Sequence, residues 1–153
     1  MWSLILLIAV CLLTGFLGSL ATSTSVNSWY VELSKPSWTP PSWVFGPAWT
    51  MLYIMMAVAA WLVWRKGYTA DVRFALTLFG VQLLVNGLWS YLFFGLRWPG
   101  GALVDIAVLW VAIAATVIAF ARVSQPATWL MLPYLAWVSF AMALNLEIWR
   151  RNA

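Results

Sequence analysis

The chain has 153 residues, of which 65% are hydrophobic and only 8% are charged. A soluble domain carries about 25% charged residues, so this composition excludes a protein with an ordinary water-exposed surface and predicts an integral membrane protein. The net charge of +4 does not indicate nucleic-acid binding, because the Lys and Arg residues lie singly or in pairs at the ends of apolar runs.

Five apolar runs are each close to the length of about 20 residues that a membrane-spanning helix needs. They cover approximately residues 2–22, 45–64, 74–96, 102–121 and 127–147. A cleaved signal peptide is the alternative for the first run, but no Lys or Arg precedes it. We therefore predict one domain over residues 1–153, an all-α bundle of five transmembrane helices. Pro133 is expected to kink the last helix.

Residues 26–43, between the first two runs, form a predicted lid loop that is rich in tryptophan and proline. Pro36, Pro40 and Pro41 disfavour a helix and hold the preceding residues in extended geometry. Pro47 suits a first helical turn, so we expect the second span to begin there or just before it. The indoles of this loop are expected at the level of the lipid headgroups.

Basic residues are shared equally between the two sides of the membrane. The N-terminal side would carry Arg65, Lys66, Arg73 and Arg122, and the lid side would carry Lys35, Arg97, Arg150 and Arg151. The positive-inside rule therefore does not choose an orientation.

Polar and aromatic residues inside the spans should face the bundle interior, because they are costly in lipid. With helical spacing they include Gly18, Trp49, Tyr53, Gln82, Asn86, Trp89, Asp105, Leu109, Tyr134, Trp137, Ala141 and Asn145. Given the alternating helix directions, most of them fall in the lid half of the bundle. This predicts a cavity lined by indoles and amides under residues 26–43. The alternative is that the indoles only pack the bundle and the amides join helices.

Three further features carry expectations about contacts. Gly80, Gly87 and Gly95 share one face of the third span, which allows close helix contact within the bundle or in a homodimer; we favour the homodimer. Asp105 is expected to be structural and paired with a cation such as Arg97. The chain has no histidine and a single cysteine, Cys11, so we expect no metal site and no resident cofactor.

Four segments carry a family resemblance: WYVELSKPSWTPPSWVFGPAWTMLY (29–53), QLLVNGLWSYLFFG (82–95), ALVDIAVLW (102–110) and LPYLAWVSFAMALN (132–145). They resemble the tryptophan-rich sensory protein family, which includes the mitochondrial translocator protein (peripheral-type benzodiazepine receptor). The resemblance extends over essentially the whole chain, and its W-x-P-P-x-W-V-F-G-P-x-W block is specific.

The resemblance implies a five-helix membrane protein, commonly dimeric, that binds porphyrins such as protoporphyrin IX and isoquinoline or benzodiazepine-type ligands. The matching ligand positions are Tyr30, Trp49, Asn86, Trp89, Leu109, Trp137, Ala141 and Leu144, to which the spacing adds Tyr53 and Asn145. Animal members also bind cholesterol, but Leu146 stands where the proposed sterol motif has tyrosine. The family occurs in bacterial cytoplasmic or outer membranes and in mitochondrial outer membranes, and the sequence does not choose among them.

We expect a binding protein, a sensor or carrier, for porphyrins and related lipophilic ligands. The first alternative is a porphyrin-degrading enzyme, because Trp49 and Trp137 match positions linked to porphyrin breakdown in some bacterial members; no nucleophile–base pair supports it. The second is a transporter of tetrapyrrole or sterol-like ligands, for which no inverted repeat is found. Lys35, Arg97, Arg150 or Arg151 could meet the carboxylates of a porphyrin.

Overall fold

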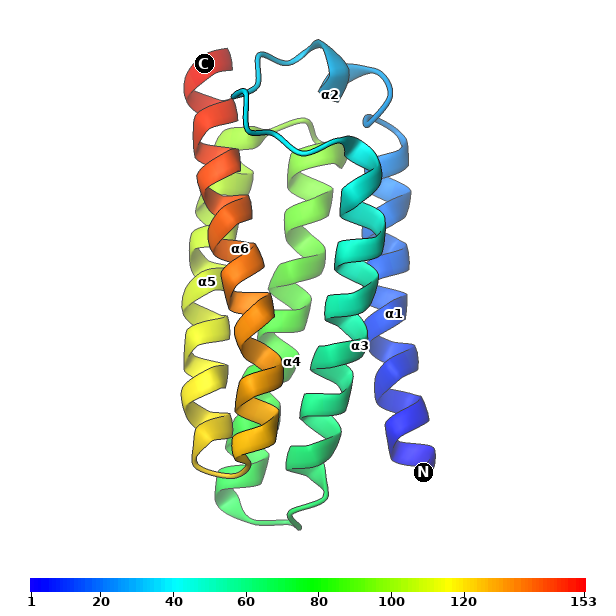
Figure 1. Cartoon of the computed structure of the whole chain (residues 1–153), viewed down its shortest axis with the longest axis vertical. Coiled ribbons are helices and arrows are strands. Elements are labelled where there is room, and N and C mark those ends of the chain that lie inside the picture. Colours follow the sequence, from blue (N-terminus) through cyan, green and yellow to red (C-terminus); the bar gives the residue numbers. More distant parts are fainter.

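The computed structural model describes residues 1–153 as a bundle of five long helices with a loop across one end (Figure 1). The long helices are α1 (Trp2–Ser23), α3 (Phe45–Trp64), α4 (Ala70–Ser90), α5 (Pro99–Ala121) and α6 (Gln125–Asn152). The short elements are α2 (Trp29–Glu32), the 3₁₀ turn η1 (Ser42–Val44) and the π-helical turn η2 (Tyr91–Gly95). All five long helices are long and apolar enough to cross a membrane, which confirms the all-α class of an integral membrane protein.

The helix ends follow local capping chemistry. Helix α4 begins at Ala70 rather than at Phe74, because the Thr69 hydroxyl accepts a hydrogen bond from the Val72 N–H (3.2 Å) and closes the first turn. Helices α5 and α6 each carry a proline in the first turn, where its missing N–H costs nothing. Pro133 does not end α6, which continues as a helix from Gln125 to Asn152.

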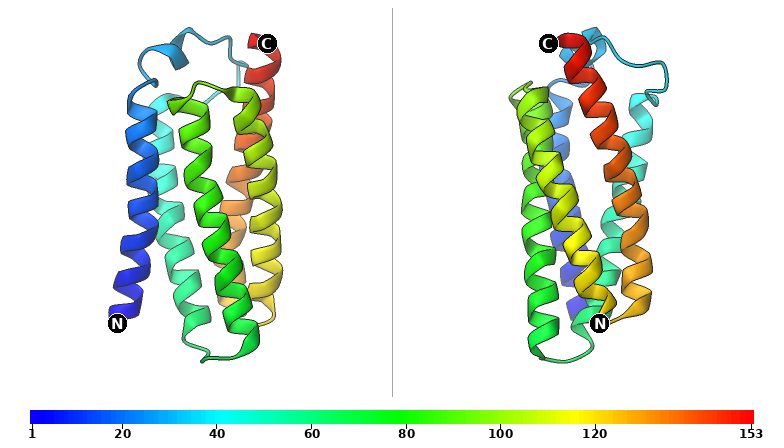
Figure 2. Two further views of the ribbon diagram at one scale, coloured as in Figure 1. Left: turned by 180° about the vertical axis from the view of Figure 1, so that it is seen from behind. Right: turned by 90° about the vertical axis from the view of Figure 1, so that its left-hand side faces the viewer.

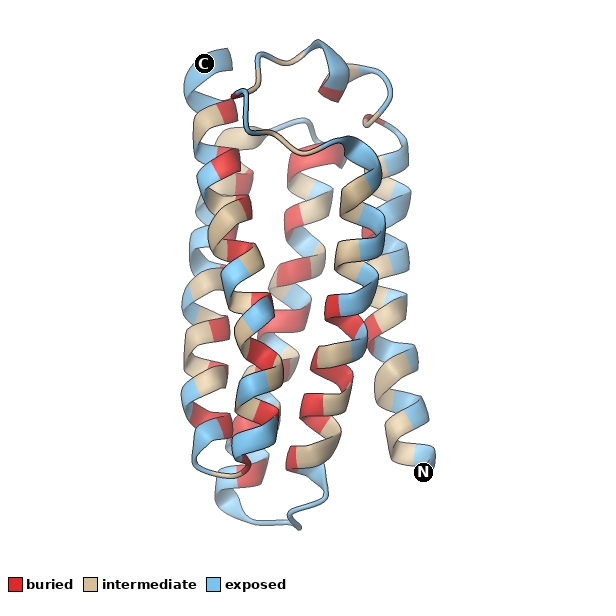
Figure 3. Cartoon of the chain, viewed as in Figure 1, coloured by how far each residue is buried: buried red, intermediate tan, exposed pale blue.

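Helix α1 lies at the edge of the bundle, against α3 and α4 (Figure 2). Only Cys11 and Gly18 of α1 are buried, whereas each of the other long helices turns a row of buried side chains inward (Figure 3). Helix α5 packs between α4 and α6, and α3 packs against α6. The outer faces of all five helices are therefore left to the acyl chains of the membrane.

The glycines of α4 and η2 differ in what they face. A Cβ at Gly87 would lie 3.5 Å from the Thr14 methyl group, and one at Gly95 would lie 3.7 Å from the Ala21 Cβ, so both glycines face α1 inside the bundle. Only Gly80 faces open space. Of the two possibilities left open by the sequence, packing within the bundle therefore holds for Gly87 and Gly95, and the homodimer stays a prediction.

The lid crosses the bundle from α1 to α3 and contains the short helix α2, which the sequence did not predict (Figure 1). Its middle is tied to the end of α6. The Ser34 N–H donates to Asn152 Oδ1 (3.0 Å), and Asn152 Nδ2 donates back to the Ser34 carbonyl (2.9 Å). The Trp38 ring also packs edge-on against Phe140 of α6. The lid is thus held over the space between α1, α3 and α6.

The π-helical turn η2 ends the third span under the lid. The Leu96 N–H donates to the Tyr91 carbonyl (2.8 Å), so the chain widens where the sequence predicted a continuous α-helix. This turn brings the rings of Phe93 and Phe94 to 6.2 and 5.6 Å from the Tyr30 ring. The Ser25 hydroxyl donates to the Phe94 carbonyl (2.6 Å) and fixes the turn to the start of the lid.

Candidate functional site

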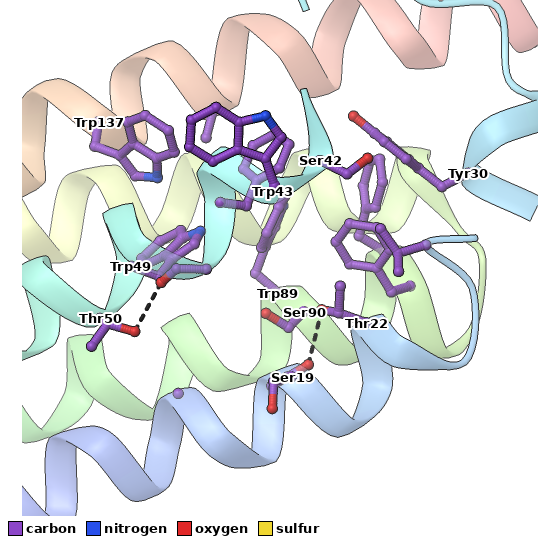
Figure 4. Close-up of a pocket in the computed structure, with 18 of the residues that line it drawn as sticks. Ser19, Thr22, Tyr30, Ser42, Trp43, Trp49, Thr50, Trp89, Ser90 and Trp137 are labelled. Atoms are coloured by element: carbon purple, nitrogen blue, oxygen red, sulfur yellow. Dashed lines mark hydrogen bonds between the residues drawn. The ribbon is translucent and has the colours of Figure 1, made fainter. Parts of the chain in front are cut away.

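A cavity of about 710 Å³ lies on the lid side of the bundle (Figure 4). This is within the range of about 300–1,000 Å³ typical of small-molecule sites. Its walls are Leu12, Gly15, Phe16, Gly18, Ser19 and Thr22 of α1; Val26, Asn27, Tyr30, Ser42 and Trp43 of the lid; Phe45, Gly46, Trp49, Thr50 and Tyr53 of α3; Trp89, Ser90, Phe93 and Phe94 of α4 and η2; and Trp137, Ala141, Leu144, Asn145 and Ile148 of α6.

Trp49 is the centre of the aromatic wall. Its ring centroid lies 5.7 Å from that of Tyr53, 6.5 Å from Trp89, 6.4 Å from Trp137 and 6.2 Å from Tyr134. The Trp137 and Tyr134 rings meet the Trp49 ring edge-on. The planes of the Tyr53 and Trp89 rings are tilted from it by 30° and 34°. Four rings from three helices therefore hold the indole in place.

Helix α1 forms one wall because it carries two glycines there. A Cβ at Gly15 would lie only 2.6 Å from the Tyr53 ring, and one at Gly18 would lie 3.0 Å from Ser90 Oγ. The absent side chains let α1 approach α3 and α4 closely. The sequence analysis singled out Gly18 but not Gly15, Ser19 or Thr22. These small or hydroxyl-bearing residues share the face of Gly18 at the helical spacing i, i+3, i+4 and i+7, and this spacing is the signal that could have found them.

The amide of Asn145 holds the Trp89 indole. Trp89 Nε1 donates to Asn145 Oδ1 (3.0 Å), and Asn145 Nδ2 donates to the Pro99 carbonyl at the start of α5 (2.9 Å). Trp89 is nine-tenths buried and Asn145 is almost fully buried. These hydrogen bonds fix the position of both side chains in the wall. Trp89 Nε1 and the Asn145 amide are therefore already hydrogen-bonded within the protein.

A chain of buried hydrogen bonds lies behind the wall. The Tyr53 hydroxyl donates to Asn86 Oδ1 (2.6 Å), Asn86 Nδ2 donates to the Tyr134 hydroxyl (2.5 Å), and that hydroxyl donates to Gln82 Oε1 (2.8 Å). The chain connects α3, α4 and α6. It begins at Tyr53, a wall residue, and ends at Gln82 in the closed core.

Two polar groups on the wall have no partner. The Tyr30 hydroxyl and Trp137 Nε1 are both buried, and neither makes a hydrogen bond. Burial raises the pKa of Tyr30 to about 12, so its hydroxyl stays protonated and able to donate. Because a buried donor without a partner costs about 1–3 kcal/mol, an acceptor atom of a ligand at these two positions would be favoured.

No charged side chain lines the cavity, and the cations on the lid side are engaged elsewhere. Lys35 Nζ donates to the Tyr30, Val31 and Leu33 carbonyls, and Arg97 Nε donates to Ser25 Oγ (3.2 Å). Arg150 and Arg151 both pair with Glu147. The expectation that one of these cations waits at the rim for a carboxylate is therefore not supported by their contacts.

Asp105 does not have the partner that the sequence suggested. It lies on the buried face of α5, and its Oδ2 has no hydrogen-bond partner. Arg97 adopts a left-handed backbone conformation (φ 53°) and turns to Ser25 instead. The predicted Asp105–Arg97 pair is wrong, because the π-helical turn redirects the chain just before Arg97.

Most of the predicted ligand residues meet at this cavity. Tyr30, Trp49, Tyr53, Trp89, Trp137, Ala141, Leu144 and Asn145 lie on its wall. Asn86 lies behind the wall in the hydrogen-bond chain, and Leu109 is in the closed core, since α5 contributes no wall residue. Phe93 and Phe94 also lie on the wall, because the π-helical turn η2 places them there. The sequence analysis did not select them. No group of three or more His, Cys, Asp or Glu side chains is placed to hold a metal ion.

Comparisons with known proteins match nearly the full length. Residues 7–150 match the profile of the TspO/MBR family. The chain is 47% identical to "Tryptophan-rich protein TspO" of Chlorobaculum tepidum, over 98% of this chain and 96% of the relative. It is 45% identical to the protein of the same name in Archaeoglobus fulgidus, over 95% and 94%. It is 43% identical to the human "Translocator protein", over 90% of this chain and 82% of the relative.

Proposed function

The chain belongs to the TspO/MBR family, and from this premise we propose that it is a membrane-embedded binding protein, a sensor or carrier, for porphyrins and related flat lipophilic ligands. The observation that carries the proposal is the aromatic-lined cavity under the lid. Residues 1–153 act as one domain. The proposed ligand contacts are Tyr30, Trp49, Tyr53, Trp89, Trp137, Ala141, Leu144 and Asn145.

The cavity suits a flat aromatic ring system. Trp49, Trp89 and Trp137 present indoles from three helices to one space, and Phe93 adds a further ring stacked on Trp89 at 5.4 Å. Aromatic pairs contribute roughly 0.5–1.5 kcal/mol each beyond the burial of apolar area. The chain has no histidine, a usual axial ligand of haem iron, so we expect metal-free protoporphyrin to bind at least as well as haem and choose it as the probe.

The part of the ligand that enters the cavity is uncharged. An ionised carboxylate inside would have no cation to pair with, because Lys35, Arg97, Arg150 and Arg151 are engaged with other groups. The carboxylates of a tetrapyrrole would therefore remain at the lid, in water. A neutral carbonyl of a ligand would accept a hydrogen bond from either the Tyr30 hydroxyl or Trp137 Nε1, which also fits amides of the isoquinoline and benzodiazepine type.

The test compares protoporphyrin IX with its dimethyl ester, titrated in the dark while tryptophan fluorescence is followed. We expect the ester to bind at least as tightly as the free acid. A protein cation that pairs with a carboxylate would contribute about 1.5–3 kcal/mol, or roughly tenfold or more in Kd. An ester that binds more than tenfold more weakly would contradict an uncharged cavity, and no saturable binding of either compound would contradict the proposed function itself.

A sterol has less support as a ligand. Leu146, at the position of the tyrosine of the proposed sterol motif, is 39% exposed and is not on the cavity wall. A sterol there would have to bind on the outer face of α6. We therefore place porphyrins before sterols among the ligands to test.

We also propose a homodimer, formed by the outer face of α4. Gly80 has open space where a side chain would be, and Phe74, Val81, Leu84 and Leu88 beside it are exposed. A glycine among larger apolar side chains lets a helix of a second copy approach closely. Sedimentation of the detergent-solubilised protein measures whether each particle contains two chains.

A further inference from the structure

The two ends of the bundle differ in whether their cations form ion pairs. On the lid side Arg150 and Arg151 pair with Glu147, whereas none of the cations on the N-terminal side lies within ion-pair distance of a carboxylate. These unpaired cations are Arg65, Lys66, Arg73 and Arg122. The N-terminal end of the bundle therefore presents positive charge that the protein itself does not neutralise.

Three of these cations surround the turn between α3 and α4. Arg65 and Lys66 follow the end of α3, and Arg73 lies in the first turn of α4. Gly67 makes the turn possible, because its φ of +104° is one that other residues rarely adopt. The Arg65 guanidinium lies over the Trp61 ring (4.6 Å), and that of Arg73 lies 5.4 Å from the Tyr68 ring. Neither contact pairs the guanidinium with a negatively charged group.

A second cavity, of about 580 Å³, opens at this turn. Its wall combines apolar side chains (Trp64, Val72 and Leu76) with polar ones (Tyr68, Arg73 and Thr77). Trp64 and Tyr68 are 51% and 80% exposed, as is typical of aromatic side chains at the level of lipid headgroups. We call this cavity the α3–α4 crevice. The turn between α3 and α4, at which the crevice opens, lies at the opposite end of the bundle from the lid (Figure 1).

We propose that the α3–α4 crevice binds the headgroup of an anionic phospholipid. The Arg73 guanidinium donates to the phosphate in the crevice, and Arg65 and Lys66 add positive charge at its edge. The acyl chains then pass Leu76 and enter the membrane. Asp71 is the acidic residue beside this group, so three cations face one carboxylate and the balance favours an anion.

A lipid fits this crevice better than a free anion does. The apolar side chains Val72, Leu76 and Trp64 form much of the wall, and inorganic phosphate has nothing to place against them. Both α3 and α4 are membrane spans, so the crevice lies where headgroups meet acyl chains. The proposal does not depend on the lid-side cavity or on its ligand.

The test uses native mass spectrometry of the purified full-length protein in detergent, with dioleoyl phosphatidylglycerol and dioleoyl phosphatidylcholine as probes. We expect phosphatidylglycerol to remain bound at lower concentration than phosphatidylcholine. The Arg73→Gln variant should lose about tenfold or more in affinity for phosphatidylglycerol, as expected when a charge-assisted hydrogen bond is removed. Arg122→Gln is the matched control, because it removes one charge at the same end but outside the crevice, and it should change the affinity by less than about twofold.

A second variant tests the cavity rather than the charge. Thr77→Tyr fills the crevice at an exposed wall position without changing any charge, and it should also lose phosphatidylglycerol. The helical circular dichroism and thermal unfolding of each variant in detergent check that the bundle is still folded. Equal retention of the two lipids, equal losses in Arg73→Gln and Arg122→Gln, or displacement of the lipid by millimolar inorganic phosphate would each overturn the proposal.

Discussion

Replacing Trp49 with alanine is expected to weaken protoporphyrin IX binding by about a hundredfold, or about 3 kcal/mol, the size of effect seen for central tryptophans in binding sites. Trp49 contacts the rings of Tyr53, Trp89, Tyr134 and Trp137, so its loss removes the centre of the aromatic wall. The Kd is measured by quenching of tryptophan fluorescence in the dark.

Two further variants show whether the effect is local. Trp49→Phe keeps an aromatic ring at this position and should lose tenfold or less, since part of the stacking remains. Trp129→Ala is the matched control: Trp129 is 68% exposed, lies near the start of α6 and is not on the cavity wall. Similar affinity losses in Trp49→Ala and Trp129→Ala would mean that the indoles act only through general packing.

Replacing Tyr134 with phenylalanine is expected to destabilise the bundle by about 2 kcal/mol, although it removes a single oxygen atom. The hydroxyl accepts from Asn86 and donates to Gln82, so both amides lose a partner in a fully buried place. The free energy of unfolding is measured in mixed micelles with increasing sodium dodecyl sulfate. Ligand binding should weaken as well, because Asn86 also holds Tyr53 of the cavity wall.

The control for Tyr134→Phe is Tyr68→Phe, at a tyrosine that is 80% exposed and should tolerate the change within about 0.5 kcal/mol. Adding Gln82→Leu to Tyr134→Phe removes one of the two stranded amides and should restore part of the stability. Equal stability of Tyr134→Phe and the wild type would show that water or a rearrangement replaces the hydrogen-bond chain.

The position of the cavity could be predicted from the sequence because rare polar and aromatic residues carry information in an apolar chain. Trp49, Trp89, Trp137 and Asn145 stand on three helices (α3, α4 and α6), and the direction of each helix puts them in the same half of the bundle. The structure brings all four to one wall. Helix α1 shows the opposite case: its wall residues include no indole or amide, so the sequence analysis did not select Gly15 or Phe16 as lining the cavity.

The contacts of polar side chains could not be predicted from spacing. Asn86 has the helical position of a wall residue, but the Tyr53 and Tyr134 hydroxyls engage it behind the wall. Arg97 has a sequence position near Asp105, but the π-helical turn directs it to Ser25. Such choices depend on angstrom-scale geometry at the ends of helices, which a hydropathy pattern does not record.

The cavity under the lid is tested most directly by filling it. Ala141 is on its wall and 5% exposed, and Ala141→Phe would occupy the space of a ligand ring without removing any aromatic contact. The measurement is the dark titration of protoporphyrin IX against the wild type, Ala141→Phe and the lipid-facing control Val108→Phe. We predict saturable binding by the wild type and by Val108→Phe, and at least tenfold weaker binding by a folded Ala141→Phe variant. Undiminished binding by Ala141→Phe would contradict the account, because the ligand would then lie outside this cavity.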